Sequence, residues 1–224
     1  MTEEWPPEPD AETLRREMMG AFAHEIRTPL TSIRMVMELA KRSADADGGM
    51  RLDRELAEML AASVDDLQQL ADDLQEMSRL ERGKLALAPG PCDLAAAVSA
   101  AGELLGGSPA IEGEAPPAVE GPWDAGRLVR ALAGLARSAN RMGDGSGTVR
   151  LTCRVEPGQA VVEFASGRPG GEERPIAADA GFAFFRARQL VVAMGGSVHC
   201  ERRERFARVA AVLPLGGPGG RGGG

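Results

Sequence analysis

Two long segments with the repeat of an amphipathic helix constrain the fold of this chain more than any other feature. In the first, residues 11–43, apolar side chains recur at steps of three and four: Phe22, Ile26, Leu30, Ile33, Met37 and Ala40. In the second, residues 51–82, one heptad seam is interrupted only by Ser63 and carries Leu52, Leu56, Met59, Leu67, Leu70, Leu74 and Met77. Such spacing is typical of helices that bury one stripe in a bundle or coiled coil. The break ADADGGM at 44–50 therefore predicts an antiparallel helical hairpin.

A hairpin with two such seams cannot bury both of them by itself. The simplest remedy is a second copy of the chain, because two hairpins together form a four-helix bundle with one shared core. The sequence therefore predicts a homodimer that is held through residues 11–82.

The second half of the chain, after a linker predicted over 83–93, has a different pattern. Helices are expected in three segments, 93–105, 121–142 and 182–196, with Asp124 as the N-cap of the second. Paired strands are expected in TVRLTCRV and AVVEFAS, which flank the turn EPGQ, and again within 197–215. The sequence thus predicts an α+β fold overall: the helical hairpin, then a domain over 94–215 with helices on a mixed sheet. Residues 1–10 and the glycine-rich 216–224 are expected to be disordered.

Composition argues against several classes of function. The net charge of −7 opposes binding to nucleic acid or to anionic membranes. No apolar run approaches the roughly 20 residues of a membrane span, and the acidic start MTEEWPPEPD is unlike a signal peptide. Cys92, Cys153 and Cys200 are widely spaced and accompanied by only two histidines, which disfavours a zinc site. We therefore expect a cytoplasmic protein with reduced thiols, no metal and no membrane segment.

One of the two histidines, His24, stands in the stretch AFAHEIRTPL of the first helical segment. At about 100° per residue it lies roughly 160–200° around the helix from both Phe22 and Ile26. Since those two residues belong to the apolar seam, the imidazole of His24 is expected to point into solvent.

The neighbours of His24 favour a chemical role over that of an ordinary exposed histidine. Glu25 can accept the proton of one ring nitrogen, which makes the other nitrogen more nucleophilic. Thr28 lies one turn further on the same face and can hold a water molecule by hydrogen bonding. Pro29 removes a backbone donor and frees a carbonyl beside the site, at a cost of about 3 kcal/mol in a helix interior. This combination predicts a reactive His24.

The stretch FAHEIRTPLTSI resembles the phosphoacceptor box of the bacterial histidine kinase dimerisation domains almost residue for residue. The predicted hairpin and its exit SRLERGKLAL are similar to the same family, and the resemblance to its two-domain core spans residues 11–215. The resemblance implies that His24 is the phosphorylated residue, Glu25 its acid–base neighbour and Thr28 a phosphatase-type residue. It also implies a response-regulator receiver domain as partner. That domain is expected to dock near His24 on exposed residues such as Met18, Gly20, Ala21, Arg27 and Thr31.

The second half resembles the ATP-binding domain of that family, but its nucleotide motifs depart from the family pattern. Ser138 takes the position of the magnesium-binding Asn, followed by Arg141 as the basic residue, and Asn140 lies about 200° around the helix from Ser138. The adenine-binding Asp aligns with Ala165, whose methyl group cannot accept a hydrogen bond.

The glycine-rich box and its surroundings also depart from the pattern. The box reads GFAFF over 181–185, so Gly181 is followed by Phe182, Ala183, Phe184 and Phe185 where backbone must approach phosphates closely. The lid over ATP is expected to be short, because only about a dozen residues separate the two boxes. GDGSG at 143–147 lacks the Lys-Ser/Thr of a phosphate loop and predicts a turn. Together these departures predict a domain that has lost nucleotide binding, with no cofactor.

Three functions remain open at this point. The first is a histidine phosphotransfer protein that exchanges phosphate between His24 and receiver domains, since an intact first half with an eroded second half suits that role. The second is an ATP-dependent histidine kinase, with ATP and magnesium, whose nucleotide motifs have diverged. The third is a non-enzymatic dimeric adaptor for two-component proteins, which would predict decay around His24 that the sequence does not show.

Overall fold

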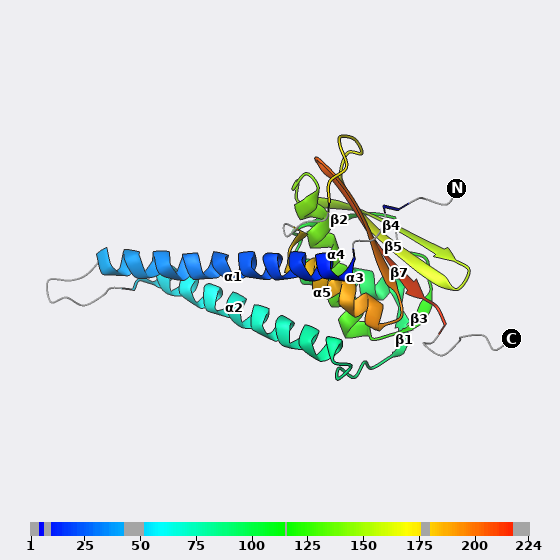
Figure 1. The fold of residues 1–224 in the computed structure, drawn as a ribbon, viewed down its shortest axis with the longest axis horizontal. Helices are drawn as coiled ribbons and strands as arrows, with labels where there is room; N and C mark the ends of the chain where they lie inside the picture. Colours follow the sequence, from blue (N-terminus) through cyan, green and yellow to red (C-terminus); the bar gives the residue numbers. More distant parts are fainter. Residues whose placement is uncertain (1–4, 7–9, 43–51, 115, 176–179, 217–224) are drawn as a thin grey trace.

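Two long antiparallel helices, α1 (Ala11–Arg42) and α2 (Arg54–Glu81), extend as a hairpin from one side of the molecule (Figure 1). The computed structural model describes residues 5–6, 10–42, 52–114, 116–175 and 180–216. The helices begin where carboxylates cap them: Asp10 Oδ1 accepts from Thr13 N–H at 2.9 Å, and Asp53 Oδ1 accepts from Leu56 N–H at 2.9 Å. The predicted hairpin is thereby confirmed, whereas the predicted break at 44–50 lies outside the described residues.

The hairpin buries only part of the predicted seams within a single chain. In α1 the buried side chains beyond His24 are Pro29, Val36 and Ala40. Leu30 and Leu52 remain 50% and 45% exposed, although both belong to the predicted seams. The single chain therefore leaves an apolar stripe along the arm uncovered.

A five-stranded sheet forms the second half, in the order β2-β4-β5-β7-β6. Its strands are β2 (Ala110–Gly113), β4 (Thr148–Glu156), β5 (Gln159–Gly167), β6 (Ser197–Arg203) and β7 (Phe206–Pro214). The β2–β4 pair is parallel and the other pairs are antiparallel. Both predicted strand hairpins are present, and the sheet is mixed as predicted.

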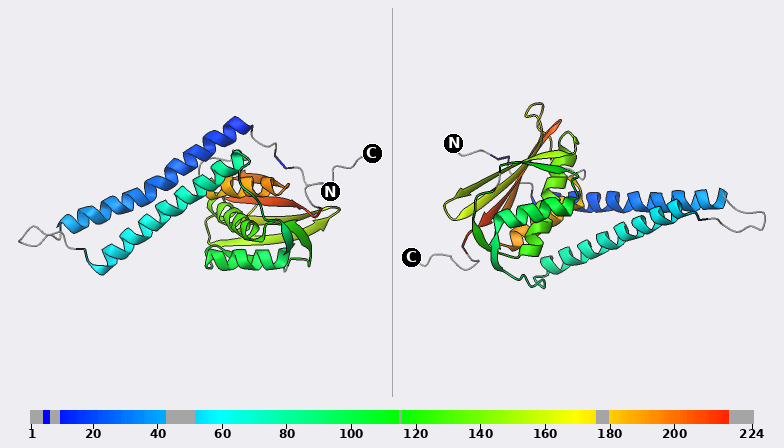
Figure 2. Two further views of the ribbon diagram at one scale, coloured as in Figure 1. Left: turned by 90° about the horizontal axis from the view of Figure 1, so that it is seen from below. Right: turned by 180° about the vertical axis from the view of Figure 1, so that it is seen from behind.

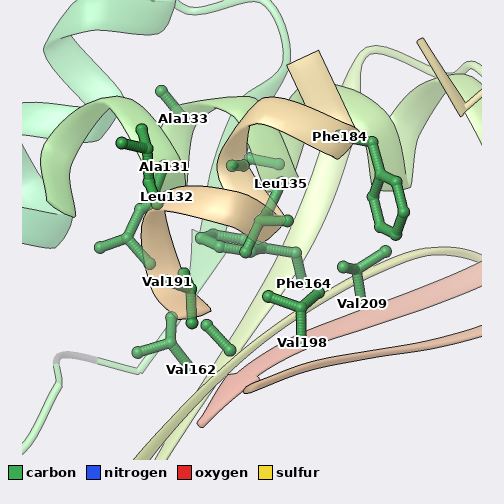
Figure 3. Packing of buried hydrophobic residues seen from close by; sticks show 14 of the residues in the cluster. Ala131, Leu132, Ala133, Leu135, Val162, Phe164, Phe184, Val191, Val198 and Val209 are labelled. Atoms are coloured by element: carbon green, nitrogen blue, oxygen red, sulfur yellow. The ribbon is translucent and has the colours of Figure 1, made fainter. Parts of the chain in front are cut away.

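Three helices, α3 (Leu94–Leu105), α4 (Ala125–Met142) and α5 (Phe182–Ala193), cover one face of this sheet (Figure 2). The core lies between α4, α5 and the sheet, where alternate side chains of β5 such as Val162 and Phe164 meet Leu132, Leu135 and Val191 (Figure 3). Asp124 caps α4 as predicted, because its Oδ1 accepts from Arg127 N–H at 3.1 Å. The three cysteines are free thiols, with Cys92 and Cys200 buried.

The linker predicted over 83–93 is shorter than expected. Gly90–Asp93 form strand β1, which pairs with β3 (Glu120–Trp123) in a separate two-stranded sheet. The helix predicted from 121 accordingly begins only at Ala125. The sequence pattern did not predict either strand, because each has only four residues, too few to show an alternation of apolar and polar side chains.

The expectation of disorder over 1–10 is corrected in part. The ring of Trp5 stacks on His199 of β6 with centroids 5.7 Å apart. The guanidinium of Arg208 in β7 lies over the same Trp5 ring, 4.1 Å from the ring centroid. Together with the cap at Asp10, these contacts tie part of the N-terminal segment to the fold. The predicted tail 216–224 lies outside the described residues from 217 onward.

The hairpin and the sheet domain share one hydrophobic core. Met18, Ala21 and Met77 of the hairpin are buried in the same cluster as the side chains of α4 and α5. Among the described residues, none of the helices is both long and apolar enough to span a membrane.

Candidate functional site

His24 lies on the solvent side of α1, as its position relative to the seam predicted. Its side chain is exposed, and its ring makes no hydrogen bond to any of the described residues. Thr28, one turn further along, is also exposed, and α1 continues through Pro29, which is buried. The imidazole is thus open to an approaching molecule.

Glu25, next to His24, turns toward the sheet domain. Its Oε1 accepts two hydrogen bonds, from Arg141 Nη1 at 2.7 Å and from the backbone N–H of Phe182 at 3.0 Å. The Phe182 N–H belongs to the first turn of α5, where backbone donors have no partner within the helix. The carboxylate of Glu25 therefore caps α5 from another part of the chain, a position that the positive end of the helix dipole favours.

Gly181 allows this close approach. Its φ of +83° is a conformation that L side chains rarely adopt. A Cβ at this position would lie 2.3 Å from Arg141 Nη1 and 2.9 Å from Glu25 Oε1. Gly181 has no side chain that could cap α5, and it leaves the space that the Glu25–Arg141 pair fills.

GFAFF is not the open loop that the sequence suggested. Phe182 to Phe185 form the first turn of α5, and the ring of Phe182 packs against Phe22 of α1 with centroids 5.1 Å apart. The correction follows from packing, because the aromatic side chains find cover in the core and against the hairpin, which favours a helix over an open phosphate loop. Ala183 lies on the side of α5 that faces α4, where its carbonyl oxygen would be 3.0 Å from a Cβ on Gly134.

Four ion pairs between described residues cross the same boundary, and these four have the same polarity. Carboxylates of the hairpin meet arginines of the sheet domain: Asp73 pairs with Arg186, and Glu76 Oε1 lies 3.3 Å from Arg127 Nε and 3.1 Å from Arg130 Nη2. Burial raises the pKa of Asp73 above 3.8, with the positive charge of Arg186 opposing that shift. The hairpin is the acidic side of this boundary and the sheet domain is the basic side.

A cleft of about 670 Å³ separates the hairpin from the sheet domain. From the hairpin it is lined by Glu25, Thr28 and Asp73, and from the sheet domain by Ser138, Arg141 and Ala183. The cleft brings together six of the site positions that the sequence singled out, namely Glu25, Thr28, Pro29, Ser138, Arg141 and Ala183, and His24 is not in its lining.

The polar groups on α4 are already used within the domain. The Oγ of Ser138 is buried and donates to the carbonyl oxygen of Gly134 at 2.8 Å. Asn140 Oδ1 accepts from the backbone N–H of Gly147 at 3.0 Å and so fixes the predicted turn after α4. The hydroxyl proton of Ser138 and the amide oxygen of Asn140 are thus both engaged in hydrogen bonds within the sheet domain.

Ala165, the predicted counterpart of the adenine-binding Asp, does not face the helices. Along β5 the side chains of Val162, Phe164 and Ser166 face the helices, so Ala165 faces the opposite side of the sheet. Ser166 is 2% exposed, and its Oγ donates to Asp144 Oδ1 at 3.0 Å. A Cβ on Gly143 would lie 2.7 Å from Ser166 Oγ, so the end of α4 closes over this hydroxyl.

Part of the surface expected to receive a partner near His24 is covered. Gly20, Arg27 and Thr31 are exposed as expected, but Met18 and Ala21 are 8% and 0% exposed. Both pack into the core that the hairpin shares with the sheet domain. Sequence periodicity could not reveal this, because the cover comes from α4 and α5, far away in the chain.

The hairpin that carries His24 matches a known family of domains. The model of the His Kinase A (phospho-acceptor) domain matches residues 14–83, which include His24 and the whole of α2. The chain has the core of a two-component histidine kinase. This histidine kinase core consists of the phosphoacceptor hairpin and an ATPase-like sheet domain, so the family resemblance of the sequence is confirmed.

Several histidine kinases are similar to this histidine kinase core over most of its length. The signal transduction histidine-protein kinase BaeS of Escherichia coli is 28% identical over 162 residues, which are 70% of this chain and 34% of that protein. The probable sensor histidine kinase TcrY of Mycobacterium tuberculosis is 30% identical over 167 residues, 71% of this chain and 34% of that protein. The chain thus spans about a third of the length of these relatives.

Solved structures confirm the fold. The histidine kinase AdeS of Acinetobacter baumannii has a TM-score of 0.66 at 19% identity, over 86% of this chain and 98% of that chain. The histidine kinase ThkA, solved with the response regulator TrrA, has a TM-score of 0.57 at 19% identity, over 92% of this chain and 63% of that chain. The α+β architecture of hairpin and ATPase-like domain is therefore that of histidine kinases.

Proposed function

We propose that this protein is a histidine phosphotransfer protein, which receives a phosphoryl group on His24 from one receiver domain and passes it to another. The observation that carries the proposal is the open imidazole of His24 on α1, beside a cleft in which Glu25, Arg141 and Ser138 are already paired within the chain. ThkA, with the same fold, has been solved with a response regulator, which supports a receiver domain as the partner.

The transfer step needs no group from the sheet domain. A neutral ring nitrogen of His24 attacks the phosphorus of an aspartyl phosphate on the receiver. A P–N bond forms, the P–O bond breaks, and the aspartate leaves as a carboxylate. Transfer requires nucleophile and leaving group to lie in line, so the receiver must reach the exposed face that also carries Thr28. In this proposal Glu25 accepts the proton of the other ring nitrogen and Thr28 positions water when the phosphoryl group is hydrolysed.

The residues of the cleft do not fit the ATP and magnesium that the family implies. Ser138 offers a metal no amide oxygen in place of the family's Asn, and its hydroxyl proton is already donated to Gly134. The first turn of α5 receives the Glu25 carboxylate where a phosphate would bind, and Ser166 is closed over by Gly143. We infer that nucleotide binding is lost.

The test uses the full chain and a receiver domain that carries radiolabelled aspartyl phosphate. Label is expected on the wild type and absent from His24→Gln, with slower transfer to Glu25→Ala while receiver binding persists. Equal labelling of His24→Gln would contradict the phosphotransfer assignment. In a parallel incubation with labelled ATP and magnesium, labelling of His24 would favour the ATP-dependent histidine kinase instead, and binding of receivers without any labelling would favour the dimeric adaptor.

A further inference from the structure

In the structure the carboxylate of Glu25 binds the sheet domain and not His24. As the neighbour of His24 it would accept a ring proton, but its Oε1 is bound by Arg141 Nη1 at 2.7 Å and by Phe182 N–H at 3.0 Å. No hydrogen bond joins it to the ring of His24 in the part of the chain that the structure describes. The conformation seen here thus withholds Glu25 from the imidazole.

We propose that Arg141 is a positioning residue that controls phosphotransfer at His24 by holding Glu25 on the sheet domain. The inference rests on the proposed function and adds its regulation. In the held state His24 lacks its proton acceptor and transfers slowly, and release of Glu25 restores the fast reaction. Arg141 and the first turn of α5 therefore form a latch, defined here as the Glu25–Arg141 pair and the Phe182 N–H.

The surroundings of the latch make the held state specific. Gly181 leaves the space that the pair occupies, since any Cβ there would meet Arg141 and Glu25 at 2.3 and 2.9 Å. The Phe22–Phe182 ring contact, at 5.1 Å, lies on the same two helices and brings them together next to the carboxylate.

The latch can open without loss of the fold. The side chains of Arg141 and Glu25 are 47% and 23% exposed, so water can solvate both after they separate. An ion pair with a half-exposed partner stabilises the fold only weakly, so thermal motion or a docking partner can separate it. The Asp73–Arg186 and Glu76–Arg130 pairs remain to hold the two halves together.

The chain offers a matched control on the same helix. Arg137 lies one turn before Arg141 on α4 and is also exposed, but its Nη2 donates at 3.4 Å to the carbonyl oxygen of Leu104, within the sheet domain. Arg137→Gln removes the same charge without touching Glu25. Arg141→Lys keeps a cation that can still reach the carboxylate.

The experiment measures the rate of phosphoryl transfer from a labelled receiver to the full chain. Arg141→Gln is expected to transfer about three- to tenfold faster than the wild type, while Arg137→Gln and Arg141→Lys stay within twofold of it. In a Glu25→Ala background the gain from Arg141→Gln should vanish, because there is no carboxylate to release. Hydrogen exchange provides a readout without phosphate: the Phe182 amide should lose protection in Glu25→Ala.

The outcomes separate this inference from the proposed function. Labelling of His24 at equal rates in wild type and Arg141→Gln would overturn the latch and leave phosphotransfer standing. A gain that persists in the Glu25→Ala background would also overturn it, because the effect would not pass through Glu25. An unchanged exchange rate at Phe182 in Glu25→Ala would remove its structural basis. Absence of label from every variant, the wild type included, would reject the proposed function itself.

Discussion

Asp124 shows at the scale of a single residue how one carboxylate joins separate parts of the chain. Its Oδ2 accepts from Ala88 N–H at 3.0 Å, its Oδ1 accepts from Arg127 N–H at 3.1 Å, and the Arg127 guanidinium pairs with it. Burial acts to raise its pKa, but these hydrogen bonds and the nearby positive charge outweigh burial and hold the pKa below 3.8. The exit of the hairpin is thereby fixed to the start of α4.

Asp124→Asn should make stability less dependent on pH. A carboxylate with a lowered pKa in the folded state contributes stability above pH 3.8, and that contribution is lost as the pH falls through the folded pKa. We expect Asp124→Asn to lower the free energy of unfolding by about 1–2 kcal/mol at pH 7. Urea denaturation of the wild type and Asp124→Asn from pH 7 down to pH 3 measures this difference in the free energy of unfolding. A difference that stays constant over this range would contradict the prediction.

Single residues also mark where sequence reasoning reached its limit. The exposure of His24 followed from helix periodicity alone, because all the residues that define the seam are local. Which of Ala165 and Ser166 faces the helices cannot be predicted from the sequence, because a slip of one residue in a strand moves a side chain to the other face of the sheet. Only the register of β5 against β7, with Ala165 opposite Arg208 and Ser166 opposite Ala207, resolves this choice.

At the scale of elements, α4 and α5 come together through Gly134. A Cβ there would lie 3.0 Å from the carbonyl oxygen of Ala183 and 3.2 Å from the Cβ of Ala187. Gly126, in the first turn of the same helix, is exposed, and a Cβ there would have only an ordinary contact of 3.9 Å, with Asp124 Oδ1.

The two glycines give opposite predictions for the same substitution. Gly126→Ala should raise the free energy of unfolding by about 0.5–1 kcal/mol, because alanine loses less backbone entropy on folding. Gly134→Ala should lower it by about 1–3 kcal/mol, since the added methyl forces α4 and α5 apart. Thermal denaturation of both variants tests the pair, and equal stabilisation by both would show that the α4–α5 contact can relax.

The existence of the elements was largely predictable, and their contacts were not. The long periodic runs of α1 and α2, the N-cap of α4 and the strand hairpins carry local signals. The docking of the hairpin on α5 has no such local signal in the sequence. Met18 and Met77 have the spacing of ordinary members of an apolar stripe. The latch joins Glu25 to Arg141 and Phe182 from elements that no local pattern connects.

At the scale of the whole molecule, the uncovered stripe of the hairpin predicts association. Leu30 and Val64 are 50% and 47% exposed on the two helices of the arm, with Met35 and Leu52 exposed as well. Apolar side chains gathered along one arm favour burial against a second copy. We expect a homodimer at micromolar concentration.

Charges placed on this stripe should separate the dimer. The double variant Leu30→Asp with Val64→Asp is expected to run as a monomer in light scattering, because two buried carboxylates without partners oppose association. Val155→Asp is the control, since Val155 is 47% exposed on β4, in the sheet domain. A monomeric wild type, or a double variant that stays dimeric, would show that this stripe is not the contact between copies.

The Glu25–Phe182 hydrogen bond spans 157 positions of the chain, and this separation sets an order of events during synthesis. At about 5–20 residues per second, α5 leaves the ribosome roughly 8–30 s after α1. Helices form within microseconds, so the hairpin exists long before the surface that covers Met18 and Phe22. During this interval Met18 and Phe22 lack the cover that the sheet domain gives them in the folded chain. Closure of the sheet domain onto the hairpin is therefore a late step, which must await the synthesis of α5.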